Sequence, residues 1–598
     1  MDYDRCRSLP EMFFEQADRL GAKPFLWAKR DGAYRPTSWA AAAHEVRRLA
    51  QGLRALGIGA GERVALVAEN RPEWVIADLA IMSAAAVTVP AYVTNTIEDH
   101  RHVFATSGAR AVIVSRASLS ARVVAAANQV AAVHTVIAIE PVAGQASSVD
   151  ILGWDEVLRR GDEEPADIAA QIAGLAPDDL ACLIFTSGTG GMPKGVMTTH
   201  RNILANSRGA YRLLELLGLG DEVFLSFLPL SHSYEHTAGL MFPISIGAQI
   251  YFAEGAETLS ANLLEARPTI MTAVPRLYET LHRRILLGVE RKGGIARSMF
   301  GRTVAIGRKR AAGSLSLTDR LIDPALDRLV RAGLRRRFGG RLKAMVSGGA
   351  PLNPEIGSFF LALGVTLLQG YGQTEAGPVI ACNSPAHIKI DTVGPPLDGV
   401  EVRLAGDGEL LVAGDNVMKG YWNDPQATAQ TLDDGWLKTG DVGEIDADGY
   451  IRITDRKRDF IKNSGGEMVS PARVEGYLTL EPEIAQAMVV GDRRPYLVAI
   501  LVPNADFAVD FAAMNNLSTD LAALAADSGF IKAMRAAVMR VNRNLAPAER
   551  VRRFMVAPEP FTIANGQMTP TLKIKRHAIR AAHGAFLDSL YDGKGMAA

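Results

Sequence analysis

The chain contains 598 residues, of which 48% are hydrophobic and 22% are charged. This length exceeds what one hydrophobic core normally serves, so we expect at least two domains, and the composition excludes a disordered protein. The 65 basic and 65 acidic residues cancel, which removes any whole-molecule attraction to nucleic acid.

The positions of the cysteines and the sequence of the N-terminus indicate the cellular compartment of the protein. Cys6, Cys182 and Cys382 are far apart and lack CxxC spacing, which argues against a disulfide framework or structural zinc and favours a reducing compartment. Residues 1–16 have no apolar segment followed by a cleavage site, so no signal peptide is expected. We predict a cytoplasmic protein that at most binds the cytoplasmic face of a membrane peripherally.

The longest apolar run, residues 74–93, contains Asp78 and Pro90. These two residues favour a buried helix that runs into a strand over a membrane span.

The alternation of short β-branched runs with Ala-rich helical stretches predicts an α/β fold with largely parallel strands. The clearest runs are residues 63–68, 111–115 and 135–139. Residues of about 392–454 change to short strands with Gly and Asp turns, which predicts a β-rich subdomain. A charged segment follows, then a new apolar alternation typical of a compact α+β unit. We therefore place domains at 1–457 and 458–598.

A predicted strand at residues 181–185 leads into a loop rich in Gly, Ser and Thr that ends in Pro193-Lys194-Gly195. Glycines let backbone N–H groups approach phosphate oxygens, hydroxyls add donors, and Lys194 adds a charge, so the loop suits a polyphosphate. The spacing is not that of a P-loop. Judged by composition alone, an ordinary flexible turn is the commoner interpretation.

Further short strings carry polar side chains at predicted turns. In isolation each is more often structural: a lone histidine is commonly a core residue, and a turn acid is commonly solvated. The strings are residues 227–232, 346–351, 370–375, 436–441, 455–462, 465–467 and 568–576.

Taken in order, these strings resemble the adenylate-forming superfamily of acyl-CoA synthetases, peptide-synthetase adenylation domains and firefly luciferases. The resemblance runs from about residue 20 to residue 580. It implies a large N-terminal domain of layered mixed sheets with the β-rich subdomain, and a small mobile α+β C-terminal domain. It also implies the activity: ATP and a carboxylic acid give an acyl-adenylate and pyrophosphate, and coenzyme A then accepts the acyl group. ATP, Mg²⁺ and coenzyme A are the expected cofactors and co-substrates.

The resemblance assigns roles residue by residue. For the phosphates it implies Thr186, Ser187, Gly188, Thr189 and Lys194. For the rest of the nucleotide it implies Gly348, Gly349, Ala350, Tyr371, Gly372 and Thr374, with Asp441 and Arg456 at the ribose. Glu375 is implied as the Mg²⁺ ligand, His232 as a residue of the acyl channel, and Lys573 as the catalytic lysine of adenylation, with Lys575 as its nearest rival. Arg458 is implied as the hinge, and Gly465, Gly466 and Glu467 as the loop that approaches the thiol.

Two positions depart from the family pattern. Gly190 stands where Thr or Ser is usual, which puts one hydroxyl contact in doubt. Glu467 stands where many short-chain synthetases have Arg, so a phosphate contact cannot be carried over there.

The segment 283–343 holds 17 Lys or Arg against 4 Asp or Glu and has a helical pattern. Such a stretch resembles long-chain synthetases and predicts a long-chain fatty acid as substrate. Its charge suits peripheral contact with an anionic membrane, and a solvated helical pair is the equal alternative. No nucleic acid partner is expected. The oligomeric state stays open, a homodimer included.

Three other functions would each leave a mark in the sequence. A peptide-synthetase domain would need a carrier domain after Lys573, where about 25 residues follow. A non-catalytic lipid-binding paralogue would lack at least one of Lys194, Glu375, Asp441 and Lys573, and all four are present. A fatty acyl-AMP ligase, which forms the adenylate without using coenzyme A, stays open.

Overall fold

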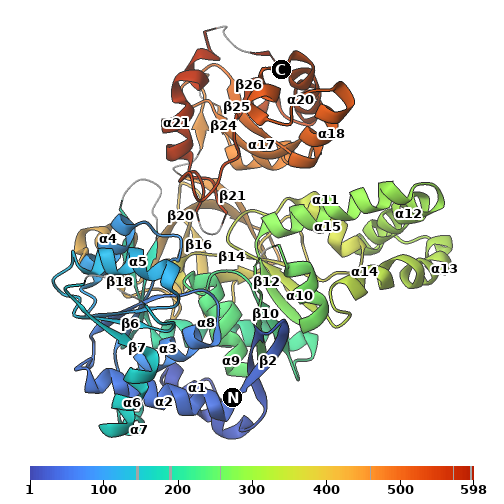
Figure 1. Ribbon diagram of the computed structural model, residues 1–598. Coiled ribbons are helices and arrows are strands. Elements are labelled where there is room, and N and C mark those ends of the chain that lie inside the picture. Colours follow the sequence, from blue (N-terminus) through green and yellow to red (C-terminus); the bar gives the residue numbers. More distant parts are fainter. Residues whose placement is uncertain are drawn as a thin grey trace.

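The computed structural model describes residues 1–142, 147–186, 192–255, 257–457, 460–465, 467–569, 572–592 and 596–597. Residues up to 457 form two large mixed sheets and a smaller β-sheet, and residues from 460 onward form a separate α+β unit (Figure 1). The α/β class predicted from the sequence is confirmed.

The first sheet has eight strands in the order β15-β14-β13-β12-β10-β11-β1-β2. Its inner pairs are parallel, and β15 and β2 are antiparallel edge strands. The bounds are β15 Val379–Cys382, β14 Leu367–Gly372, β13 Ala344–Ser347, β12 Ile270–Ala273, β10 Val223–Ser226, β11 Gln249–Phe252, β1 Pro24–Arg30 and β2 Ala33–Ser38.

The second sheet also has eight strands, in the order β18-β9-β8-β4-β3-β5-β6-β7, with antiparallel pairing only where β9 meets β8 and β18. The three β-branched runs of the sequence are its strands β3, β5 and β6. The bounds are β18 Gly420–Tyr421, β9 Lys194–Thr199, β8 Leu180–Thr186, β4 Val87–Pro90, β3 Arg63–Val67, β5 Ala111–Val114, β6 Thr135–Ala138 and β7 Asp150–Gly153.

The helix α3 (Pro72–Ser83) packs against strands of both sheets, β1 of the first and β3 and β4 of the second. It is buried around its circumference, as expected for a helix that is apolar on every face. The apolar run at residues 74–93 is therefore a buried helix followed by β4, as predicted. Within the described ranges, no helix is long and apolar enough to cross a membrane.

The β-rich subdomain is a five-stranded antiparallel sheet, in which β16, β17, β20 and β19 lie in order and β21 pairs with β20. The short strand β18 leaves this subdomain and joins the second large sheet. The bounds are β16 Val400–Leu404, β17 Glu409–Gly414, β19 Leu432–Asp433, β20 Trp436–Ile445 and β21 Ile451–Arg456.

The C-terminal unit lies beyond the end of β21 and has apolar cores of its own, built from residues between 461 and 590 (Figure 1). Its main sheet has the order β24-β25-β26-β27, and β22 and β23 form a small hairpin. The strand bounds are β22 Ile461–Lys462, β23 Met468–Val469, β24 Ile484–Val490, β25 Leu497–Pro503, β26 Val551–Val556 and β27 Met596–Ala597; the main helices are α17 Pro471–Leu478, α18 Ala505–Asn515, α20 Ser528–Asn542 and α21 Arg576–Ser589.

The basic segment is helical, as predicted, and projects from the side of the first sheet (Figure 1). We call residues 275–337 the helical arm. It comprises α11 Pro275–Lys292, α12 Gly294–Ala311, α13 Leu317–Leu326, the π-helix η3 Asp327–Arg331 and α14 Ala332–Arg337. The helix α15 (Pro354–Ala362) packs against its base.

Candidate active site

The predicted nucleotide residues gather at the carboxyl ends of β13 and β14, where ligands commonly bind in open parallel sheets. Gly348, Gly349 and Ala350 follow β13, and Tyr371 and Gly372 end β14. The loop after β13 needs its glycines. Gly349 has φ +82°, and a Cβ on Gly348 would lie 2.9 Å from the ring of Tyr234.

Asp441 lies within the long strand β20, opposite Arg456 on β21. The sequence predicted a turn here, which is wrong, because the strand continues to Ile445 through a bulge. The Asp441 side chain is 4% exposed, and it accepts hydrogen bonds from Tyr371 Oη at 2.5 Å and from Arg456 Nε at 3.1 Å. Burial raises the Asp441 pKa, and Arg456 and Tyr371 oppose that rise.

Glu375 lies on the 3₁₀ turn η4 (Thr374–Ala376) and accepts a hydrogen bond from Tyr421 Oη at 2.8 Å. The ammonium of Lys194 is 5.2 Å from the Tyr421 ring centre and 3.4 Å from Asp424. Tyr421, on β18, thus lies between the predicted metal ligand and the predicted phosphate lysine. It was not predicted, because nothing in its Gly-Tyr-Trp context distinguishes it from a packing residue.

The residues around Glu375 fit a magnesium ion that is completed by substrate. The described part of the chain has no group of three or more His, Cys, Asp or Glu residues that could hold a metal. Magnesium in nucleotide sites usually takes one or two carboxylates and fills its shell with phosphate oxygens and water. A single carboxylate beside a polyphosphate loop matches that pattern.

Thr186 and Lys194 face each other across the β8–β9 pair, so they flank the predicted phosphate loop. Ser187, Gly188 and Thr189 lie outside the described residues. So does Gly190, the position that departs from the family pattern.

His232 is half-buried in a loop that is held by hydrogen bonds with the side chain of Asn70. The Asn70 amide donates to the Leu228 carbonyl oxygen at 2.6 Å and accepts from the Leu230 N–H at 3.0 Å. His232 Nδ1 accepts from the Tyr234 N–H at 3.1 Å, which leaves the ring proton on Nε2. Burial, with the charge of Lys573, lowers the His232 pKa to about 3, so the ring is neutral.

The π-helix η2 (Glu235–Met241) begins three residues after His232. Immediately before it, the hydroxyl of Ser233 is 2.9 Å from that of Thr374, beside Glu375. Glu235 is fully buried and accepts from Ser226 Oγ at 2.6 Å and from Thr272 Oγ1 at 2.7 Å. Burial raises the Glu235 pKa to about 7. This buried acid was not predicted, because in the sequence Glu235 resembles any polar residue on a helix.

Lys573 reaches the same site from the C-terminal unit. Its backbone is held by a tight turn in which the Thr569 N–H donates to the Lys573 carbonyl oxygen at 2.8 Å and the Lys573 N–H donates to Thr569 Oγ1 at 3.0 Å. Protein atoms that crowd the ammonium, together with the positive charge of Arg456, lower the Lys573 pKa to about 8. The side chain nevertheless keeps contact with solvent. Lys573 in turn lowers the pKa values of His232 and Asp441, so the three groups lie near one another.

The predicted thiol-side loop makes its contacts within its own hairpin. Glu467 accepts from Asn463 Nδ2 at 2.8 Å, and the Glu467 N–H donates to Asn463 Oδ1 at 2.9 Å. Gly465 lies in the same turn, whereas Gly466 and the predicted hinge residue Arg458 lie outside the described residues. The structure therefore brings Lys573, not Glu467, to Asp441.

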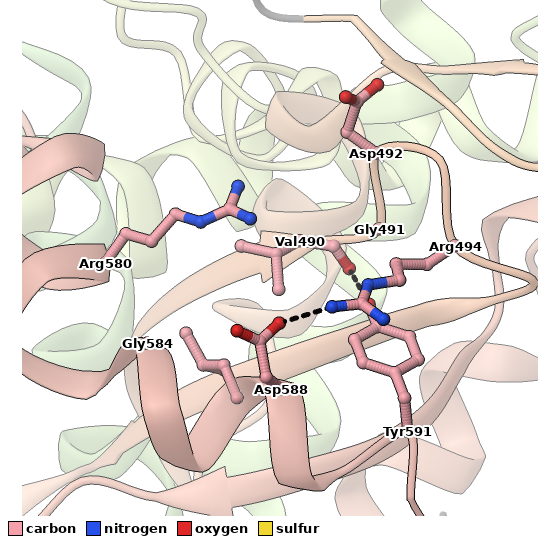
Figure 2. A pocket seen from close by; sticks show the side chains of 9 residues that line it. Val490, Gly491, Asp492, Arg494, Arg580, Gly584, Asp588 and Tyr591 are labelled. Carbon is pink, nitrogen blue, oxygen red and sulfur yellow. Dashed lines mark hydrogen bonds and ion pairs between the residues drawn. The ribbon is translucent and has the colours of Figure 1, made fainter.

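A small cavity lies away from this site, beside α21 (Figure 2). Arg494 lines it, donates to Asp588 at 2.7 Å and stacks on Tyr591 with 4.7 Å to the ring centre. Its volume of about 10 Å³ leaves room for roughly one water molecule. It is not a substrate site.

Comparisons with known proteins place both parts of the chain in one enzyme family. The AMP-binding enzyme family matches residues 13–422, and the AMP-binding enzyme C-terminal domain matches residues 458–595. The long-chain-fatty-acid–CoA ligase FadD15 of Mycobacterium bovis is 34% identical over 94% of this chain and 93% of its own length. The long-chain-fatty-acid–CoA ligase 5 of the mouse is 30% identical over 88% of this chain and 80% of its own length.

A solved structure shares the fold. The A domain of carboxylic acid reductase from Segniliparus rugosus, determined with AMP and a co-purified carboxylic acid, superimposes with a TM-score of 0.78 at 22% identity. The match covers 98% of this chain and 94% of that domain. The family match to more than half of the chain, the identity to full-length relatives and the shared fold lead to one conclusion: the chain belongs to the AMP-binding enzyme family.

Proposed function

We propose that this protein is an ATP-dependent long-chain fatty acid–CoA ligase. The observation that carries the proposal is the meeting of Lys573, Asp441 and His232 at one site. These groups come from three distant strings of the sequence, and each has a role in the two-step reaction. The names of the full-length relatives support the fatty acid as substrate.

In the first step the fatty acid carboxylate attacks the α-phosphorus of ATP, an acyl-phosphate bond forms, and pyrophosphate leaves. Asp441 is oriented by Tyr371 and Arg456 to accept hydrogen bonds from the ribose hydroxyls. Lys194 and the phosphate loop hold the polyphosphate, and Glu375 would hold Mg²⁺, which neutralises charge on the phosphates when bound. The Lys573 ammonium offsets the negative charge that gathers on the α-phosphate.

In the second step the thiol sulfur of coenzyme A attacks the acyl carbon, the bond from that carbon to the phosphate oxygen breaks, AMP leaves, and the thiol proton passes to solvent. We assign His232 to the side of the acyl group, where its neutral ring places no charge beside an apolar chain. We assign the approach of the thiol to the loop Gly465–Gly466–Glu467, after the C-terminal domain turns about Arg458.

The direct test measures pyrophosphate release with palmitate, with and without coenzyme A. A ligase releases pyrophosphate continuously only when coenzyme A is present and makes palmitoyl-CoA. A fatty acyl-AMP ligase would release one equivalent in both cases and leave coenzyme A unmodified. No release with any fatty acid would refute the proposal.

We also propose that the helical arm binds an anionic membrane, from which a long-chain fatty acid is drawn. Part of the arm's charge is structural: Arg331 is fully buried and donates to Asp323 at 2.7 Å, Arg335 bonds Asp327 at 2.7 Å, and Lys309 bonds Asp319 at 2.9 Å. Fewer cations are therefore available to a membrane than the sequence count implies.

The surface of α13 and η3 supplies what the proposal needs. Leu317 and Leu321 lie four residues apart on α13, and their side chains are 80% and 81% exposed. Two neighbouring, fully exposed leucines on one helix face form a small apolar patch, which often marks a binding surface. Arg320 and Arg328 lie on the same side by helical spacing, are exposed, and make no ion pair with any described residue. Exposed leucines flanked by arginines suit insertion at a headgroup boundary.

Liposome sedimentation tests this surface. Binding should rise with the fraction of anionic lipid and fall with salt, whose screening length is ~8 Å at physiological strength. Leu317→Ser with Leu321→Ser, or Arg320→Gln with Arg328→Gln, should weaken binding severalfold. Met514→Ser removes an apolar side chain of similar exposure, 76%, from the C-terminal unit and should leave binding unchanged. Binding that ignores lipid charge would mark the arm as solvated helices.

A further inference from the structure

The C-terminal unit meets the N-terminal region at one edge through two backbone carbonyl groups. Arg276 Nη1, in the first turn of α11, donates to the Ala485 carbonyl oxygen at 2.7 Å. Asn353 Nδ2 donates to the Gly476 carbonyl oxygen at 3.0 Å. Leu480, between the two acceptors in the chain, packs against the apolar core under α15. These contacts belong to one orientation of the two units.

Both donors have a second partner within the N-terminal region. Asn353 caps the N-terminus of α15, because its Oδ1 accepts from the Glu355 N–H at 2.9 Å, and this leaves Nδ2 to donate outward. Arg276 also donates to Glu279 Oε2 at 2.9 Å, one turn along α11. Donors that are already ordered lose little conformational entropy on docking.

The docked edge is connected to the catalytic lysine by one ion pair. Gly476 follows Glu475, whose carboxylate accepts from Arg576 Nη2 at 2.6 Å and from the Val489 N–H at 2.7 Å. Arg576 begins α21, three residues after Lys573. A shift of α17 away from Asn353 is therefore transmitted to the turn that carries Lys573.

We infer that Arg276 and Asn353 are positioning residues for the adenylation step. They dock the C-terminal unit in the orientation that brings Lys573 to Asp441, and they release it before the thiol-side loop can take its place. The inference rests on the proposed two-step ligase function. Neither residue is assigned a contact with substrate, so both act through Lys573.

The test compares the two half-reactions in Asn353→Ser and Arg276→Gln. Serine is as good a helix cap as asparagine, so Asn353→Ser removes the contact between the units and keeps α15 intact. We expect single-turnover pyrophosphate release to fall about five- to tenfold in each variant, the loss expected for one hydrogen bond, and further in the double variant. Conversion of supplied palmitoyl-adenylate and coenzyme A to thioester should stay at the wild-type rate or rise.

The matched control is Arg308→Gln, which removes an ion pair with Glu355 near the same cap without a contact to the C-terminal unit. Both half-reactions should be unchanged in it. Equal losses in both half-reactions of the positioning variants, or no loss in either, would overturn the inference.

A second measurement is independent of catalysis. In Asn353→Cys with Gly476→Cys the two thiols would lie close together, since a Cβ at residue 476 would be 3.8 Å from Asn353 Nδ2. A short bifunctional thiol reagent should cross-link them, and adding Arg276→Gln should lower the yield. An unchanged yield would contradict the inference even if the wild-type protein proved inactive towards fatty acids, so the two failures are distinguishable.

Discussion

Lys573 is a residue whose charge state changes just above neutral pH. Its pKa is lowered to about 8, so the ammonium loses its proton as pH rises through that value. Because the proposed role needs the protonated form, pyrophosphate release should decline above about pH 8. Lys573→Arg stays charged and should move the decline to higher pH. A pH series of single-turnover pyrophosphate release measures both.

The same residue should serve one half-reaction only. Lys573→Ala should lose pyrophosphate release yet still convert supplied acyl-adenylate and coenzyme A to thioester. Equal loss of both steps would count against the assignment.

Glu375 offers the second residue-scale prediction. Glu375→Gln keeps an acceptor for Tyr421 Oη but removes the charge that would hold Mg²⁺, so adenylation should fall about a hundredfold. Tyr421→Phe keeps the Glu375 carboxylate, so the rate of adenylation should fall only a few-fold. Titration of Mg²⁺ in the pyrophosphate assay separates the two. Near-normal turnover of Glu375→Gln at ordinary Mg²⁺ would remove Glu375 from the site.

Residues of short motifs were easier to predict than their partners. Asp441, Glu375 and Lys573 stand in recognisable strings. Tyr421 and Asn70 act through contacts that join positions far apart in the chain, and Glu235 matters only because strands β10 and β12 bury it. Such contacts are made by the fold, and a single sequence carries no signal for them.

The π-helix η2 carries a buried acid that links the stability of the fold to pH. Glu235 has a pKa of about 7 against an ordinary 4.5, so its contribution to stability is fully present below about pH 4.5 and is lost as pH rises through 7. Glu235→Gln does not titrate. The free energy of unfolding of the variant relative to wild type should therefore shift in the variant's favour by up to about 3 kcal/mol across that range.

Urea unfolding of both proteins at pH 5 and pH 8 measures this shift. Glu355→Gln, which replaces an exposed acid on α15, serves as the control for the general effect of removing a glutamate charge. A constant difference between Glu235→Gln and wild type would mean that Glu235 stays ionised in the fold.

Elements were predictable where local pattern decides them. The runs that became β3, β5 and β6 and the buried helix α3 follow from apolar periodicity. Asp441 was misplaced because a Gly-Asp pair usually marks a turn, whereas here Gly440, with φ +70°, and the following bulge are absorbed within β20. The pairing of β18 with β9 in another sheet depends on the tertiary fold. The two residues of β18 carry no local pattern that would predict it.

At the scale of the whole molecule, the proposed two-step reaction requires the C-terminal unit to complete the same active site in both steps, with different residues in each. Lys573 and the Gly465–Glu467 loop are both parts of that unit, and they cannot occupy the α-phosphate side together. Proline fixes φ near −65° and removes an N–H donor, so Arg458→Pro should restrict the turn between orientations.

We expect Arg458→Pro to retain adenylation and lose thioester formation, the mirror image of Lys573→Ala. Rapid-quench assays of each half-reaction provide the measurement. Wild-type transfer to coenzyme A in this variant would show that the reaction does not depend on this hinge.

The two residues of β18 have a consequence for how the protein comes apart. Gly420 and Tyr421 pair with β9 of the second large sheet, although the segments on either side belong to the β-rich subdomain. The β-rich subdomain cannot unfold without removing the edge strand β18 from the second large sheet. We therefore expect the subdomain and that sheet to unfold in one cooperative transition. The C-terminal unit has its own cores and can lose its structure alone. The second large sheet and the β-rich subdomain are therefore two sheets but one unfolding unit.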